Sequence, residues 1–67
     1  MTRKEIKNKM IKILSEEEKC SLKEAEEILK FICVDKEHLE YTIDSFMSCS
    51  EEELEKLFLE DYRSGMV

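Results

Sequence analysis

Apolar side chains recur at helical spacing in four short segments of the chain. In the first segment, Ile6, Met10, Ile13 and Leu14 follow at offsets of 4, 7 and 8. These offsets put side chains on one face of an α-helix, because about 3.6 residues complete a turn. The later stripes are Leu22, Ala25, Ile28, Leu29 and Ile32; Leu39, Ile43, Phe46 and Met47; and Leu54, Leu57 and Phe58. The pattern predicts helices over about residues 2–17, 22–33, 36–47 and 51–62.

Each predicted helix begins beside a residue that can cap it. In a capping box, a Ser or Thr hydroxyl accepts a backbone N–H three residues on, and a glutamate there bonds back to the cap's amide. The pairs with this spacing are Thr2 and Glu5, Ser21 and Glu24, and Ser50 and Glu53. Asp35 can cap the third helix. Shared capping chemistry, rather than duplication, therefore explains why SLKEAEEIL at 21–29 resembles SEEELEKLF at 50–58.

Composition favours helices and disfavours strands. The chain has 67 residues, no proline and one glycine, Gly65, which follows the last stripe and can loosen the chain there. Connections of about 2 to 6 residues favour a bundle over one long rod. We therefore expect an all-α protein: a single domain over residues 1–67, folded as a compact bundle of three to four short helices.

The sequence carries no pattern typical of membrane insertion or export. Its longest uncharged apolar stretch, FICV at 31–34, is far shorter than the roughly 20 residues that span a bilayer. The first residues interleave lysine with isoleucine, unlike the continuous apolar region of a signal peptide. Three cysteines cannot all pair within one chain, which favours reduced thiols. We expect a cytoplasmic protein.

Charge is unevenly distributed. Residues 1–12 hold five basic side chains and one acidic one, whereas the whole chain has a net charge of −6. An acidic body repels the phosphate backbone, which disfavours general nucleic-acid binding unless the basic first helix acts alone.

Candidate metal and catalytic residues are few. Cys20, Cys33, His38 and Cys49 could in principle bind zinc, but they lack the close ligand pairs of structural zinc sites. His38 stands alone on the polar side of its predicted helix, and one glycine cannot form a phosphate-binding loop. The acidic runs at 16–18 and 51–53 lack the spacing of a calcium loop. We expect no metal, no cofactor and no enzymatic activity.

Four apolar residues lie off the stripes: Ile11, Phe31, Tyr41 and Leu59. Such residues either cover the edges of a small core or form a patch that binds a partner. Our leading hypothesis is a non-catalytic interaction module, a regulator or inhibitor that docks these residues on a larger protein or a second copy of the chain. Acidic side chains would steer the approach; the candidates are Glu24, Glu27, Glu51, Glu52 and Glu55.

Two alternatives involve nucleic acids. The same glutamates could mimic the charge of a nucleic acid and block a nuclease or polymerase, as small phage-encoded proteins that counter host defence do. Residues 21–44 also resemble the two helices of a DNA-binding helix-turn-helix motif. The second of these helices, however, presents Glu37, Glu40 and Asp44 against one lysine, Lys36, which disfavours contact with phosphates.

Overall fold

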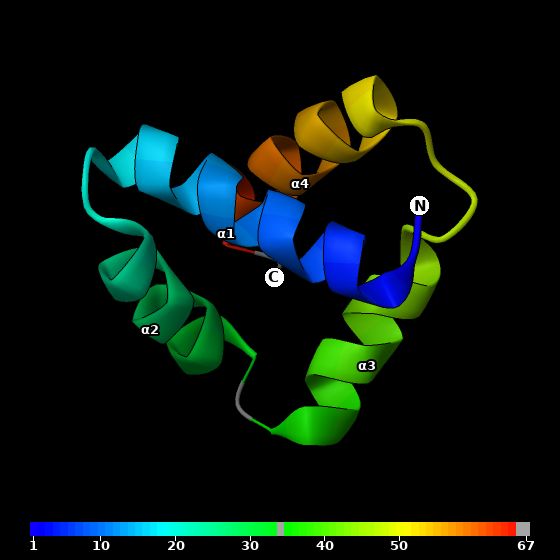
Figure 1. The fold of residues 1–67 in the computed structure, drawn as a ribbon, viewed down its shortest axis with the longest axis horizontal. Helices are drawn as coiled ribbons and strands as arrows, with labels where there is room; N and C mark the ends of the chain where they lie inside the picture. The colour runs from blue at the N-terminus through cyan, green and yellow to red at the C-terminus, as the bar shows by residue number, and fades with distance from the viewer. Residues whose placement is uncertain (34, 66–67) are drawn as a thin grey trace.

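One helix, α1 (Arg3–Glu18), lies at the centre of the fold, and the other three helices pack against it. The computed structural model describes residues 1–33 and 35–65; Val34, the last residue of the FICV stretch, lies outside this range, as do Met66 and Val67. The remaining helices are α2 (Leu22–Ile32), α3 (Lys36–Ser45) and α4 (Glu51–Ser64). In Figure 1, α2 and α3 lie below α1 and α4 lies above it. The all-α bundle of short helices is confirmed.

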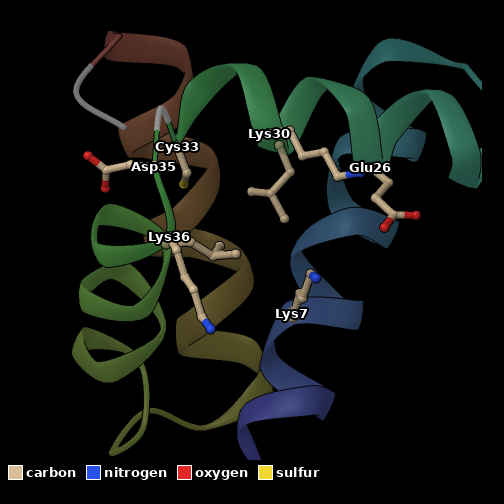
Figure 2. A pocket seen from close by; sticks show the side chains of 8 residues that line it. Lys7, Glu26, Lys30, Cys33, Asp35 and Lys36 are labelled. Carbon is tan, nitrogen blue, oxygen red and sulfur yellow. The ribbon is translucent and has the colours of Figure 1, made fainter.

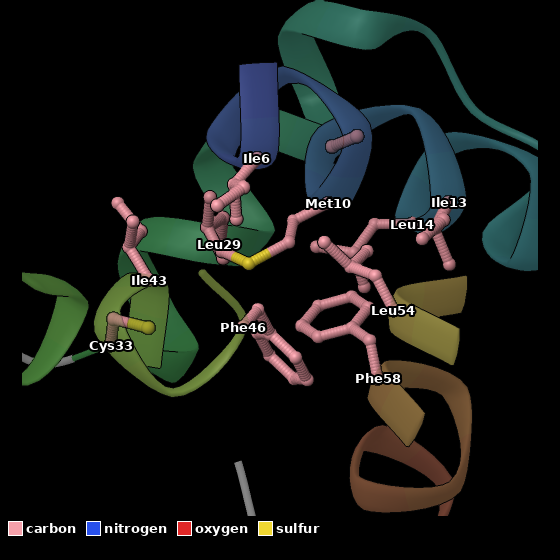
Figure 3. Packing of buried hydrophobic residues seen from close by; sticks show 11 residues of the cluster. Ile6, Met10, Ile13, Leu14, Leu29, Cys33, Ile43, Phe46, Leu54 and Phe58 are labelled. Carbon is pink, nitrogen blue, oxygen red and sulfur yellow. The ribbon is translucent and has the colours of Figure 1, made fainter. Parts of the chain in front are cut away.

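The core forms where α1 meets the other helices. All four residues of the predicted α1 stripe are buried, and they pack with residues of the later segments (Figure 3). Those residues are Ala25, Leu29, Cys33, Ile43, Phe46, Leu54 and Phe58. Phe46 and Phe58 meet edge to face, with ring centroids 6.3 Å apart, an arrangement that aromatic pairs favour. The radius of gyration is 10.7 Å, against about 11 Å for a compact domain of this length.

The predicted caps are present at the N-terminus of every helix. Thr2 and Ser50 form complete capping boxes with Glu5 and Glu53. Asp35 accepts the His38 backbone N–H at 2.7 Å. The remaining pair differs from the prediction. The Ser21 hydroxyl accepts the Glu24 backbone N–H as predicted. The Glu24 carboxylate, however, accepts a hydrogen bond from the Ser21 hydroxyl rather than from the Ser21 backbone amide.

Helix ends depart from the prediction by one or two residues. The first helix closes with Lys19 in the left-handed region, at φ 53°, and with a hydrogen bond from the Cys20 N–H to the Ser15 carbonyl. The third helix ends at Ser45, not at 47, because the next hydrogen bonds span three residues, from Phe46 to Ile43 and from Met47 to Asp44. The last helix runs to Ser64, where Gly65 adopts the left-handed conformation.

Three residues assigned to the apolar stripes are exposed, so that part of the prediction is wrong. Leu22 is 61% exposed, Met47 42% and Leu57 41%. The backbones of α2, α3 and α4 each come close to the backbone of α1 and to that of no other described helix, so only a narrow stripe of each helix is covered. Leu22 and Leu57 lie at the edges of their stripes, and Met47 lies beyond the end of α3. Within the described part of the chain, no helix has the length and apolar character needed to cross a membrane.

Candidate functional site

Two of the four predicted partner-binding residues are aromatic side chains that face solvent. Phe31, in the last turn of α2, is 85% exposed, and Tyr41 of α3 is 75% exposed. A large exposed aromatic group is informative because burying a Phe side chain is worth about 1.5–3 kcal/mol. The fold leaves the apolar area of Phe31 in water. A partner that covered Phe31 would recover this free energy.

Phe31 shares one face of α2 with two of the predicted steering residues. Glu24 and Glu27 precede it by seven and four residues, offsets that place all three side chains on the outer side of the helix. All three are exposed. The result is an aromatic side chain next to two carboxylates, which we call the Phe31 face (Glu24, Glu27 and Phe31).

Tyr41 lies on another helix. It lies on α3, whose backbone contacts α1 and not α2 within the described helices. Tyr41 and Phe31 therefore project from different helices, and neither lines any of the described cavities. The prediction that the four off-stripe residues bind a partner stays a prediction.

Ile11 and Leu59 are half-buried and pack against the core. Ile11 also lines a cavity between α1 and α2, together with Leu22. Leu59 lines a smaller depression between α1 and α4, next to Ile13 and Glu55. These two residues thus contribute to the fold as well as to the surface. The remaining predicted steering residues, Glu51, Glu52 and Glu55, are exposed on α4.

A second surface, which the sequence analysis did not identify, lies where α1, α2 and the start of α3 meet. A cavity of about 280 Å³ opens there, and Leu29, Cys33 and Leu39 form its apolar side. Figure 2 shows Lys7, Lys30 and Lys36 around this cavity, each from a different helix. The two carboxylates on its lining are Glu26 and Asp35. Three lysines and an apolar wall therefore line the same opening.

A wider, shallower cavity of about 620 Å³ continues along the α1–α2 seam. Glu26 lines both cavities, which makes them neighbours. Ile11 and Leu22 supply the apolar part of the second cavity, and Lys12, Lys23 and Asn8 supply the polar part. We call the combined feature the lysine groove; its cationic residues are Lys7, Lys12, Lys23, Lys30 and Lys36.

The lysine groove carries a positive charge on an acidic protein. Its lining holds five lysines and two carboxylates, Glu26 and Asp35, giving a net charge of +3 in a chain of −6. The ion pairs among the described residues use arginines instead: Arg3 pairs with Glu40 and Asp44, and Arg63 with Glu17. These pairs raise the pKa of both arginines and, through the Arg63 hydrogen bond, lower the pKa of Glu17. The groove lysines take no part in them.

The helical pattern of α2 contained a signal for this groove. Lys23, Glu26 and Lys30 recur at offsets of three and four residues and follow one side of the helix, next to the buried stripe. What the pattern could not show is which helix lies beside that side. The structure places α1 there, with Lys7 and Lys12.

Cys33 lies inside the fold and lines the lysine groove, whereas Cys20, Cys49 and His38 line none of the described cavities. Cys33 is buried and Cys20 half-buried; burial raises the pKa of both thiols, and the charges of Glu24 and Glu18 raise the pKa of Cys20 further. His38 is half-buried rather than fully solvated. Within residues 1–33 and 35–65, no three His, Cys, Asp or Glu side chains are grouped as metal ligands.

Comparison of the chain with protein-family models, curated proteins and solved structures finds no match in any of the three. The function must therefore be argued from the two surfaces of this molecule.

Proposed function

We propose that this chain is a non-catalytic interaction module that docks on a larger protein through the Phe31 face and regulates or inhibits that protein. The observation that carries the proposal is the 85% exposure of Phe31 next to two helix-surface carboxylates, Glu24 and Glu27. Aromatic side chains are enriched at protein interfaces and often dominate their energetics. A small domain gains nothing for its own core by holding a phenylalanine in water.

The acidic residues around Phe31 define the chemistry of the partner. Glu24 and Glu27 favour a partner surface with an apolar centre and a basic rim, because complementary charge speeds association and disfavours wrong partners. Glu51, Glu52 and Glu55 of α4 add to the negative potential that steers such a partner. Tyr41 offers a further aromatic contact for a partner that extends over α3.

The experiment is affinity capture from the native host with matched immobilised variants. We expect a protein retained by the wild type and by Met47→Ser, a control at another exposed apolar residue, but lost with Phe31→Ser. With the captured protein in hand, Phe31→Ser should weaken binding roughly thirtyfold, the equivalent of about 2 kcal/mol of buried aromatic surface. Unchanged binding by Phe31→Ser would refute this interface.

The same experiment separates the acidic alternative. A nucleic-acid mimic would bind through carboxylates, so Phe31→Ser would bind normally while neutralisation of Glu51, Glu52 and Glu55 to glutamine would abolish binding. Its affinity would also fall steeply with salt. The lysine groove weakens this alternative, because it adds five cations to a surface that would need to be uniformly anionic. The helix-turn-helix alternative is weakened by the exposed Glu37 and Asp44 on α3.

A further inference from the structure

We propose that the lysine groove binds an acidic amphipathic helix of another protein. This surface is separate from the Phe31 face, and it would need a partner of opposite charge. The inference rests on the groove's charge and on the apolar residues in its two cavities.

The charge of the groove is available to a ligand. Its residues carry a net charge of +3, and the ion pairs within the described chain are formed by Arg3 and Arg63 rather than by these lysines. Lys12, Lys23, Lys30 and Lys36 are exposed, and Lys7 is half-buried. Lysines on three helices around one opening attract carboxylates, and the cost of bringing like charges together falls when an anion binds between them.

Apolar side chains lie in both cavities of the groove. In one cavity Leu22, which is 61% exposed, lies beside the half-buried Ile11. In the other cavity the half-buried Leu39 lies beside Leu29, which is buried. A helix lying along the α1–α2 seam would place one apolar side chain in each cavity. This is the usual mode in which an amphipathic helix binds a groove.

Other occupants fit the groove less well. A nucleic acid would use the lysines but not the apolar side chains, and it would meet a remaining charge of −9 on the rest of the molecule. A second copy of the chain could offer its acidic α4, but two copies with a charge of −6 repel each other.

The test uses a fluorescein-labelled synthetic peptide of about 14 residues, four helical turns, with leucines at i, i+3 and i+7 and glutamates at most other positions. Fluorescence anisotropy measures its binding to the full chain. We expect saturable binding that weakens with salt, and at least a tenfold loss with Leu22→Ser or with Lys23→Glu combined with Lys30→Glu. Lys56→Glu, a charge reversal at an exposed site on α4, should bind within about twofold of the wild type.

Circular dichroism of each variant checks folding, which exposed substitutions should preserve. Amide chemical-shift changes on peptide addition provide a second measurement, and they should follow α1 and α2 around Ile11, Leu22 and Lys30. Each of the following results would overturn the proposal: no binding at about 1 mM protein, equal binding of a peptide with the same composition and scattered leucines, tighter binding of a single-stranded oligonucleotide, or shift changes on the Phe31 face without changes at Ile11 and Leu22. A dimer in sizing experiments that the groove variants dissociate would identify a second copy as the occupant and would likewise overturn it.

Discussion

Arg3 at the start of α1 forms an ion pair with Asp44 near the end of α3 and so joins two helices through residues that are 41 positions apart in the sequence. The same guanidinium pairs with Glu40 and donates to its backbone carbonyl at 3.2 Å. The hydrogen bond with Asp44, followed by that with Glu40, raises the pKa of Arg3. This cluster lies at the end of α1 where α3 packs.

The Arg3 ion pairs should make a small, salt-sensitive contribution to stability. Arg3→Met keeps the apolar stem but removes the charge, so we expect a lower urea midpoint at low salt and a smaller difference at high salt, because exposed ion pairs are screened. Lys4→Met is the control, since Lys4 is exposed and forms none of the described ion pairs. If Arg3→Met and Lys4→Met changed the urea midpoint equally at both salt concentrations, the Arg3 ion pairs would contribute nothing measurable to stability.

Phe58 should be critical to the fold. It is fully buried and meets Phe46 edge to face, so Phe58→Ala should lower the free energy of unfolding by about 3–5 kcal/mol. That is a large share of the roughly 5–15 kcal/mol that stabilises a typical domain. Leu57→Ala, at the exposed neighbouring position, should lower it by less than about 1 kcal/mol. Chemical denaturation followed by circular dichroism measures both values, and similar losses would refute the assignment of Leu57 to the surface.

The Ser50 cap should stabilise α4. Ser50 accepts the Glu53 backbone N–H at 3.2 Å, and Glu53 bonds back to the Ser50 amide at 3.4 Å. Ser50→Ala should lower the free energy of unfolding by about 1 kcal/mol. Ser48→Ala changes an exposed serine in the same connection and should have little effect. Equal losses for the two variants would mean that the capping box contributes nothing measurable.

Tyr62 should titrate at unusually high pH. Its hydroxyl donates to Glu18 at 2.7 Å, and this bond, with burial and the nearby negative charges, raises the pKa of Tyr62 to about 12 from 10. The fold favours the neutral phenol of Tyr62. The stabilisation that comes from this raised pKa is therefore present below about pH 10 and is lost as the pH rises towards 12.

Ultraviolet titration of Tyr41→Phe, in which Tyr62 is the remaining tyrosine, measures this value. Glu18→Ala in that background should move the pKa of Tyr62 back towards 10. Circular dichroism in the same titration reports whether the chain stays folded. A pKa near 10 while the chain is folded would show that the hydrogen bond does not form.

Cys33 should react slowly with thiol reagents. It is buried, and burial raises the pKa of its thiol, which lowers the fraction of reactive thiolate; Thr42 opposes the shift through a side-chain hydrogen bond, and Asp35 reinforces it. Mass spectrometry after timed alkylation should find Cys49, which is half-buried, modified first. Added urea should remove the difference. Equally fast modification of Cys33 in the native protein would contradict its burial.

The four helices could be predicted because their signals are local. Thr2, Asp35 and Ser50 act within one turn, and the offsets of the α1 stripe are set by helix geometry alone. Exposure depends on how many neighbours a helix has. Leu57 matched the α4 stripe but is exposed, because α4 packs along its backbone against α1 only.

The surfaces were harder to predict, because they too depend on which helices lie next to each other. Phe31 and Tyr41 were identified as off-stripe residues and do face solvent, whereas Ile11 and Leu59 pack against the edge of the core. The lysine groove was missed because Lys7 and Lys36 are far apart in the sequence. Only the packing of α1, α2 and α3 brings them to one cavity.

Because α1 lies at the centre of the fold, the chain can be divided into two fragments that should fold only when they are combined. Within the described helices, α2, α3 and α4 approach α1 along their backbones but not one another. A fragment without residues 1–18 would lose the surface that the others share and should be unstructured alone. A synthetic peptide of residues 1–18, added separately, should then restore helical structure to the fragment. Adding or withholding this peptide would control whether the fragment folds.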